Sequence, residues 1–376
     1  MILVISFVNV PAAADSDPVH MRDADWFKRG GVPEILDSDP SAPMLLFSAD
    51  DQVRTLKPGR FSSVPVRLTQ VVPLESGVDQ SHFERWLATL PVDVLNAGRF
   101  TLDNGVIRGK GGFGEATVTA LDRPGEWPRR PILVIDTAFL LSLYKDEVRT
   151  PMVPLVVKLY ATIRRSEIAP ISVWIVSRNR EVAFPLEFGY LPVLVREIFS
   201  NPRNFREELP AIWRRVQSAQ RLAFFGQRDE ALDELKELLL PETAPYAYYQ
   251  SAVLRFREAR IEEGVRDLRA AASIDPDYGR GFLLHAGAFW AKGEVGIAEF
   301  ILREGFSMFP GETSIAIGLA RALAEQAIGE RDEAPDRSMM RIREAVGLPI
   351  PEELRKEILH AFGGAPVDPG ATGNPR

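Results

Sequence analysis

The sequence predicts two fold classes in succession: a three-layer α/β domain with a mainly parallel sheet, then an all-α domain of helical repeats. Two observations carry this prediction. Up to about residue 205, short apolar runs alternate with amphipathic segments, the pattern of strands joined by crossover helices. Beyond this point strand-like runs stop, and Ala, Leu, Glu and Arg dominate. We therefore place the α/β domain at 1–205, the repeats at 206–348, and a C-terminal helix with a disordered tail at 349–376.

Apolar runs of strand length recur through the first half of the chain. The expected strands are Ile2 to Phe7, Met44 to Ser48, Val64 to Val72, Val92 to Ala97, Ile132 to Asp136 and Ile171 to Val176. The expected helices are Gln80 to Thr89, Pro151 to Arg165 and Pro192 to Ser200. The Gly-rich stretch Leu102 to Leu121 predicts a hairpin. The uninterrupted run before Asp136 predicts a strand buried on both faces, which brings this carboxylate to the sheet edge where ligands bind. An Asp at the end of a strand more often caps the following turn, and on this strand alone we expect that role for Asp136.

Composition excludes several classes of function. The chain has 376 residues, a net charge of -7 and no cysteine, so disulfides, thiolate metal sites and a cysteine nucleophile are excluded. The acidic charge argues against nucleic acid or an anionic membrane as the partner. No run reaches the roughly 18 apolar residues of a spanning helix. The apolar run Ile2 to Val10 lacks a preceding Lys or Arg, so we expect a strand in a soluble, cytoplasmic protein; a secretory signal is the alternative.

Small residues and proline recur regularly in the second half. Gly293, Ala298 and Pro310 each follow, by 34 residues, Ala259, Gly264 and Pro276, and Gly226 and Ala231 precede the first two of these by 33. Small residues let helices cross closely, and proline ends a helix because it lacks an N–H donor. The pattern resembles the tetratricopeptide repeat, a helix-turn-helix unit, over about 211–310. The resemblance implies a stack with a concave surface that binds a protein or peptide.

The same resemblance places a set of aromatic and arginine side chains, the types that most often anchor interfaces, towards the concave surface. They are Trp213, Tyr246, Tyr249, Phe256, Arg257, Arg280 and Trp290. For the aromatic residues, packing between neighbouring repeats is the alternative role. An acidic peptide would suit the two arginines, and an apolar helix would suit the tyrosines.

Three segments of the first half resemble the arginase and ureohydrolase superfamily, in which carboxylates and histidine bind two Mn²⁺ ions. They are Leu46-Phe47-Ser48-Ala49-Asp50-Asp51-Gln52-Val53, then Leu133-Val134-Ile135-Asp136-Thr137-Ala138-Phe139, and Val19-His20 with Trp26 after it. The resemblance implies a metal-ligand set of His20, Asp50 and Asp136, with Glu187 in a looser match.

At other ligand positions of this family the chain carries Ser48, Gln52, Val134 and Ala138. A two-metal site needs several bridging and terminal oxygens, and Val134 has no electron pair to donate. We therefore expect a pseudoenzyme domain without a cofactor. A single site for Mn or another divalent metal is the alternative.

Together these features predict a non-catalytic scaffold or adaptor that binds a protein or peptide through its repeats. The alternative is a metal-dependent hydrolase of guanidino or amide groups on a peptide substrate. A weaker third hypothesis is a small-ligand site at the former metal cleft. Convergence of His20, Asp50 and Asp136 would favour the hydrolase, because one ion cannot bind side chains about 8 Å apart.

Overall fold

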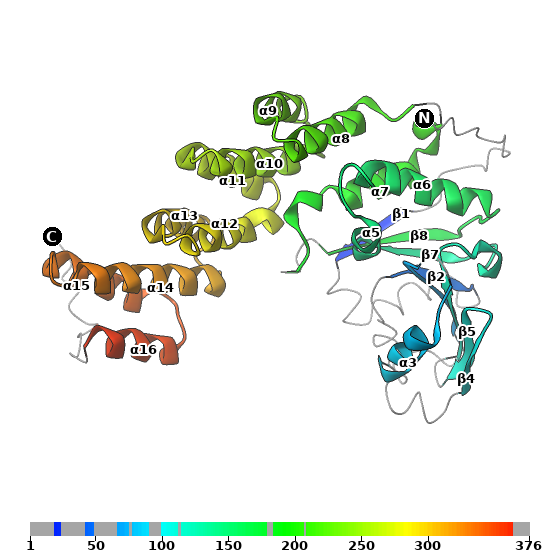
Figure 1. Cartoon of the computed structure of the whole chain (residues 1–376), viewed down its shortest axis with the longest axis horizontal. Coiled ribbons are helices and arrows are strands. Elements are labelled where there is room, and N and C mark those ends of the chain that lie inside the picture. Colours follow the sequence, from blue (N-terminus) through cyan, green and yellow to red (C-terminus); the bar gives the residue numbers. More distant parts are fainter. Residues whose placement is uncertain are drawn as a thin grey trace. The chain divides into compact units, whose positions relative to one another are not determined.

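The computed structural model describes residues 19–23, 42–48, 66–74, 77–89, 99–111, 114–178, 183–206 and 208–363. Contacts within the chain form two compact units, Met1–Glu234 and Leu235–Arg376. The first unit contains the sheet and the second contains helices (Figure 1). The division of the sequence at residues 205 and 348 stays a prediction.

The first unit is built on one mixed sheet of eight strands. Its order is β1-β8-β7-β2-β3-β6-β5-β4. The strands are β1 (Val19–Asp23), β2 (Met44–Phe47), β3 (Val66–Val72), β4 (Arg99–Asp103), β5 (Val106–Gly111), β6 (Gly114–Ala120), β7 (Ile132–Asp136) and β8 (Ser172–Ser177). Neighbours from β1 to β6 in this order run parallel, and β5 and β4 are added antiparallel. The mainly parallel sheet is confirmed, with its antiparallel part in the predicted hairpin region.

Four expected strands correspond to β2, β3, β7 and β8. The expected strands Ile2 to Phe7 and Val92 to Ala97 lie outside the described residues. Strand β1 is not predicted by the sequence, because His20, Arg22 and Asp23 interrupt its apolar residues. It forms through backbone pairing with the edge of β8, from Val19 opposite Val173 onwards.

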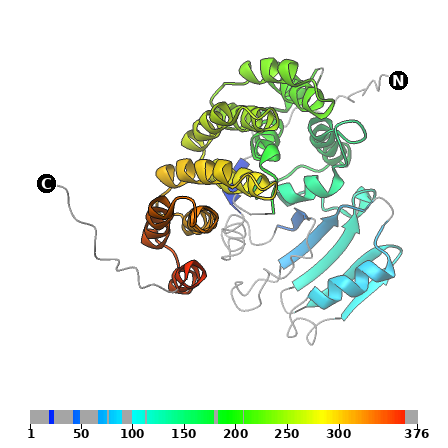
Figure 2. The ribbon, with the colours of Figure 1, turned by 60° about the vertical axis from the view of Figure 1, so that its left-hand side comes forward.

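Helices cover both faces of the sheet. The cyan helix α3 (Gln80–Thr89) lies across the strands on one face (Figure 2), where Trp86 packs edge-on against Phe100 at 5.1 Å between ring centroids. On the other face Phe47 packs against Phe139 at 5.3 Å. That layer contains α5 (Thr137–Leu143), α6 (Met152–Arg165) and α7 (Leu191–Ser200). The arrangement gives three layers, and every residue of β7 between them is buried, as the sequence predicts.

The second unit consists of consecutive helix pairs, α10 with α11, α12 with α13 and α14 with α15 (Figure 1). The helices are α10 (Ala244–Arg257), α11 (Ile261–Ile274), α12 (Gly281–Trp290), α13 (Val295–Met308), α14 (Thr313–Glu330), α15 (Pro335–Gly347) and α16 (Glu352–Phe362). We call α10, α12 and α14 the first helices and α11, α13 and α15 the second helices. None of the helices in the described part of the chain is long and apolar enough to cross a membrane.

One turn conformation recurs at the repeat positions. Gly226, Ala259 and Gly293 have φ values of 78°, 58° and 81°. In each turn the N–H of the next residue donates to a carbonyl five residues earlier: Gln227 to Leu222, Arg260 to Arg255, and Glu294 to Phe289, at 2.9 to 3.0 Å. This is the Schellman helix ending, which favours glycine at the left-handed position. The recurrence confirms the register that the sequence predicts for these turns.

Small residues lie where the two helices of a pair cross. A Cβ atom on Gly264 of α11 would lie 2.7 Å from the ring of Phe256 on α10. A Cβ atom on Gly305 of α13 would lie 2.8 Å from Phe282 on α12. Side chains at these glycines would therefore separate the helices, which explains the small residues of the repeat.

Candidate functional site

The carboxyl end of β7 holds a buried ion pair. The Nε atom of Arg178 donates to both carboxylate oxygens of Asp136, at 2.9 and 3.1 Å, and a terminal guanidinium nitrogen donates to Oδ2. Both side chains are 4% exposed. Asp136 also accepts from the backbone N–H of Ala138 at 3.0 Å and thereby caps α5. The carboxylate is neutralised and most of its lone pairs are engaged, so a cation would have to displace Arg178.

The chain holds Arg178 in this place through Thr137. The hydroxyl of Thr137 donates to the Val176 carbonyl at 3.1 Å and accepts from the Arg178 N–H at 3.2 Å. These bonds join the start of α5 to the end of β8. Arg178 is not among the residues that the sequence predicts for a site. The signal for it in the sequence is a cation directly after a buried strand, beside a second strand that ends in a carboxylate.

Of the other predicted metal ligands, the two within the described residues do not join this pair. His20 stacks on Trp174, with 4.2 Å between ring centroids, and β8 separates its strand from β7. Glu187 is exposed in the 3-10 helix Leu186–Phe188. Asp50 lies outside the described residues. Within the described ranges no three His, Cys, Asp or Glu side chains are placed to hold a metal ion. The metal assignment stays a prediction.

Trp213 lies inside the first unit. It belongs to α8 (Ala211–Phe224), is 0% exposed, and donates from Nε1 to Glu197 of α7 at 2.7 Å. Its ring lies 6.1 Å from that of Tyr190. Trp213 therefore anchors α8 against the α/β layers, which corresponds to packing, the alternative role of the aromatic residues.

The remaining predicted partner residues divide by exposure. Tyr246, Tyr249 and Phe256 are buried, because their rings fill the space between helices rather than an open surface. Arg257 is exposed, and Arg280 and Trp290 are half-buried. Trp290 donates to Glu325 of α14 at 2.8 Å. The partner role of the seven predicted residues stays a prediction. Arg257, Arg280 and Trp290 are the ones whose side chains are at least partly exposed.

An unusual histidine lies beneath this surface. The ring of His285 on α12 lies 4.6 Å from that of Phe256 and 5.7 Å from that of Tyr249. Its Nε2 atom is buried and has no hydrogen-bond partner among the described residues. Burial lowers the pKa of His285 to about 4, and the positive charge of Arg257 adds to this effect. The imidazole is therefore neutral and serves as part of the aromatic packing.

We expect this histidine to make the stability of the second unit depend on pH. An ordinary His has a pKa of 6.5, so the unfolded chain takes up the proton first. Stability is complete above pH 6.5 and falls as the pH drops towards 4, by about 2 kcal/mol at pH 5. Urea unfolding of the wild type and of His285→Phe at pH 7 and pH 5 measures this. A pH effect of equal size in both proteins would exclude His285 as its source.

The solvent face of α12 has the character of a binding surface. Its sequence GFLLHAGAFW contains no charged residue, so the helix is apolar all round. Leu284 is nevertheless 43% exposed, and Gly287 and Ala288, on the same face, are exposed as well. A Cβ atom built on Gly287 meets no atom within 4 Å. An open apolar helix face of this kind is the candidate functional site.

One solved structure is similar to part of this chain. No protein-family model matches the sequence, and no curated protein matches it. Among solved structures, the crystal structure of a protein named MamA is similar, with 16% sequence identity and a TM-score of 0.24. The match covers 49% of this chain and 89% of that protein. A TM-score this low carries no assignment of function.

Proposed function

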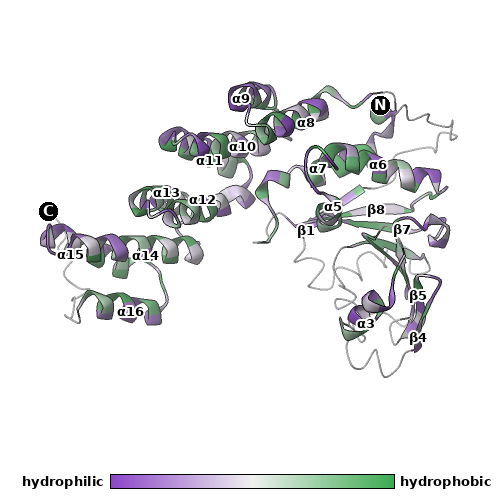
Figure 3. Ribbon diagram, viewed as in Figure 1, coloured by the Kyte–Doolittle hydropathy of each residue, from purple (hydrophilic) through white to green (hydrophobic). Residues whose placement is uncertain are grey.

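We propose that this chain is a non-catalytic scaffold or adaptor whose helical repeats, of the tetratricopeptide type, bind a protein or peptide. The observation that carries the proposal is the exposed apolar face of α12, at Leu284, Gly287 and Ala288. The apolar character of α12 can be followed in green in Figure 3. Exposed apolar surface without a partner is costly in water, and a bound segment would remove this cost.

Two arginines near α12 favour an acidic or amphipathic segment. Arg257 is exposed at the end of α10, and Arg280 directly precedes α12. A peptide with apolar residues over Leu284 and carboxylates towards these arginines would match both features. Of the two kinds of partner that the sequence leaves open, this chemistry corresponds to the acidic peptide.

For the first unit we propose an arginase-like domain that lacks metal chemistry. The support is the Asp136–Arg178 ion pair and the position of Val134 in the apolar core, with 0% exposure. The rival metal-dependent hydrolase would need Asp50 and further ligands to replace Arg178 around Asp136. We expect purified protein to contain well under one equivalent of Mn, Fe or Zn in elemental analysis. Stoichiometric metal that disappears in Asp136→Ala would favour the hydrolase.

A photo-crosslinker tests the binding face directly. With p-benzoylphenylalanine at Gly287, irradiation of cells that make the chain is expected to link it to a discrete partner. Gly287 suits this substitution because it is exposed and a Cβ atom built there meets no atom within 4 Å. The matched position is Phe300 on the second helix α13, which is 38% exposed and is expected to give no such product.

Leu284→Glu places a charge in the middle of the apolar face. We expect it to reduce the crosslinked product at least about tenfold, because a desolvated carboxylate opposes apolar contact. Phe300→Glu is the control for surface charge. Equal crosslinking from both positions, or a product that Leu284→Glu leaves unchanged, would contradict this binding face.

A further inference from the structure

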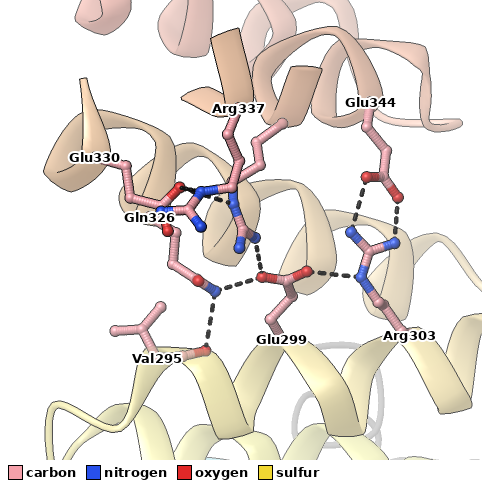
Figure 4. A network of polar contacts seen from close by, with 8 residues as sticks. Val295, Glu299, Arg303, Gln326, Glu330, Arg337 and Glu344 are labelled. Carbon is pink, nitrogen blue, oxygen red and sulfur yellow. Dashed lines mark hydrogen bonds and ion pairs between the residues drawn. The ribbon is translucent and has the colours of Figure 1, made fainter. Parts of the chain in front are cut away.

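The second helices are joined by a repeated ion pair. Counted from the first residue of α11, α13 and α15, the ninth residues are Arg269, Arg303 and Arg343. Arg269 pairs with Glu304, the tenth residue of α13, and Arg303 pairs with Glu344, the tenth residue of α15. The second pair is bidentate, with 2.8 Å for one of its two hydrogen bonds (Figure 4). Each second helix thus presents an arginine to a glutamate of the following one.

Arg343 ends this series. It is exposed, and among the described residues it has no ion-pair partner. The described chain continues into α16, which packs on both α14 and α15, as α14 packs on α12 and α13. Helix α16 therefore takes the place of a first helix, and in the residues described up to Gly363 no second helix follows it.

The fifth residue of each second helix shows the same change. Val265 of α11 and Glu299 of α13 are 3% and 8% exposed, whereas Met339 of α15 is partly exposed. Helix α15 thus has an apolar and cationic edge at the place where α11 and α13 each meet another second helix.

We propose that this edge of α15, formed by Met339 and Arg343, binds an amphipathic helix from a partner protein. The helix would take the place of the next second helix and supply a glutamate to Arg343. This surface is separate from the solvent face of α12. It continues an interface that already exists twice within the chain, with the same charge complementarity.

The existing interfaces also specify the partner helix. Where α13 follows α11, Arg269 pairs with Glu304, and three residues before Glu304 lies Ile301, which is 0% exposed. Where α15 follows α13, the buried Glu299 is matched instead by Arg341. The fifth residue of α15, Met339, is apolar like Val265 of α11 and unlike Glu299 of α13. The edge of α15 therefore resembles that of α11. The partner helix should carry an apolar residue three positions before its glutamate.

A peptide with the sequence of α13, Val295–Met308, is the probe. It is kept helical by a staple between solvent-exposed positions, because a free peptide of this length is mostly unfolded. Fluorescence anisotropy with the full chain is expected to show saturable binding. Arg343→Glu should weaken it about fivefold, and the Glu304→Arg peptide should bind Arg343→Glu more tightly than it binds the wild type.

The matched control is Arg321→Glu, at an exposed arginine on the first helix α14, which should leave the affinity unchanged. Absence of binding, an affinity that Arg343→Glu leaves unchanged, or failure of the charge swap would overturn the proposal. Sedimentation velocity of the chain alone tests the other occupant. Self-association abolished by Arg343→Glu would assign the edge to a second copy and overturn the assignment to a partner protein.

Discussion

Arg178→Ala is expected to lower the free energy of unfolding of the first unit by about 3 to 5 kcal/mol. In the wild type the Asp136 carboxylate is 4% exposed, and the substitution removes the cation that pairs with it. A carboxylate in that position is poorly solvated, and its bond to the Ala138 N–H does not compensate for the lost charge. Urea denaturation followed by tryptophan fluorescence measures the change, since Trp174 and Trp127 lie within this unit.

The control is the double variant Asp136→Leu with Arg178→Met. Because it removes both charges and keeps apolar volume, we expect it to be more stable than Arg178→Ala. Its N-cap bond to α5 is lost, which costs about 1 kcal/mol. If Arg178→Ala were as stable as the wild type, the Asp136 carboxylate would not need Arg178 for its stabilisation. That result would favour a metal ion bound at Asp136.

Trp213→Ala is expected to destabilise the first unit by about 3 to 5 kcal/mol. The side chain is 0% exposed, and its removal leaves a cavity between α7 and α8 and deprives Glu197 of a donor. Thermal unfolding followed by circular dichroism measures the loss.

Two further variants separate packing from partner binding. Trp213→Phe keeps most of the volume and should cost clearly less than alanine, because only the hydrogen bond and the edge of the ring are lost. Trp290→Ala removes a half-buried tryptophan and should have a smaller effect on stability than Trp213→Ala. A Trp213→Ala protein of unchanged stability would contradict its anchoring role.

The parts of the fold that follow from local patterns can be predicted from the sequence. The uninterrupted apolar run before Asp136 is sufficient to identify the buried strand β7, and the spacing of Gly226, Ala259 and Gly293 identifies the turns. Both signals depend on residues close together in the chain. Helix α15 does not follow the 34-residue period. It starts at Pro335, 40 residues after the start of α13 at Val295.

The candidate sites depend instead on distant pairs. Arg178 and Asp136 are 42 residues apart, and only the adjacency of β7 and β8 brings them together. Burial of Tyr246 and Phe256 likewise depends on how α10 packs, which the repeat period alone does not determine. Aromatic residues suit an interface and a core equally well, so their type cannot distinguish the two.

The Glu299 network means that the repeats are not interchangeable modules. The Glu299 carboxylate accepts hydrogen bonds from Arg303, Arg341 and Gln326 (Figure 4). Arg341 and Gln326 belong to the next helix pair, α14 with α15. In an array made by duplicating α12 and α13, each Glu299 would face Ile301 of the next copy in place of Arg341. The resulting buried charge would disfavour that order. Neighbouring helix pairs in this chain thus contact each other through specific side chains. These contacts determine the order of the pairs along the stack.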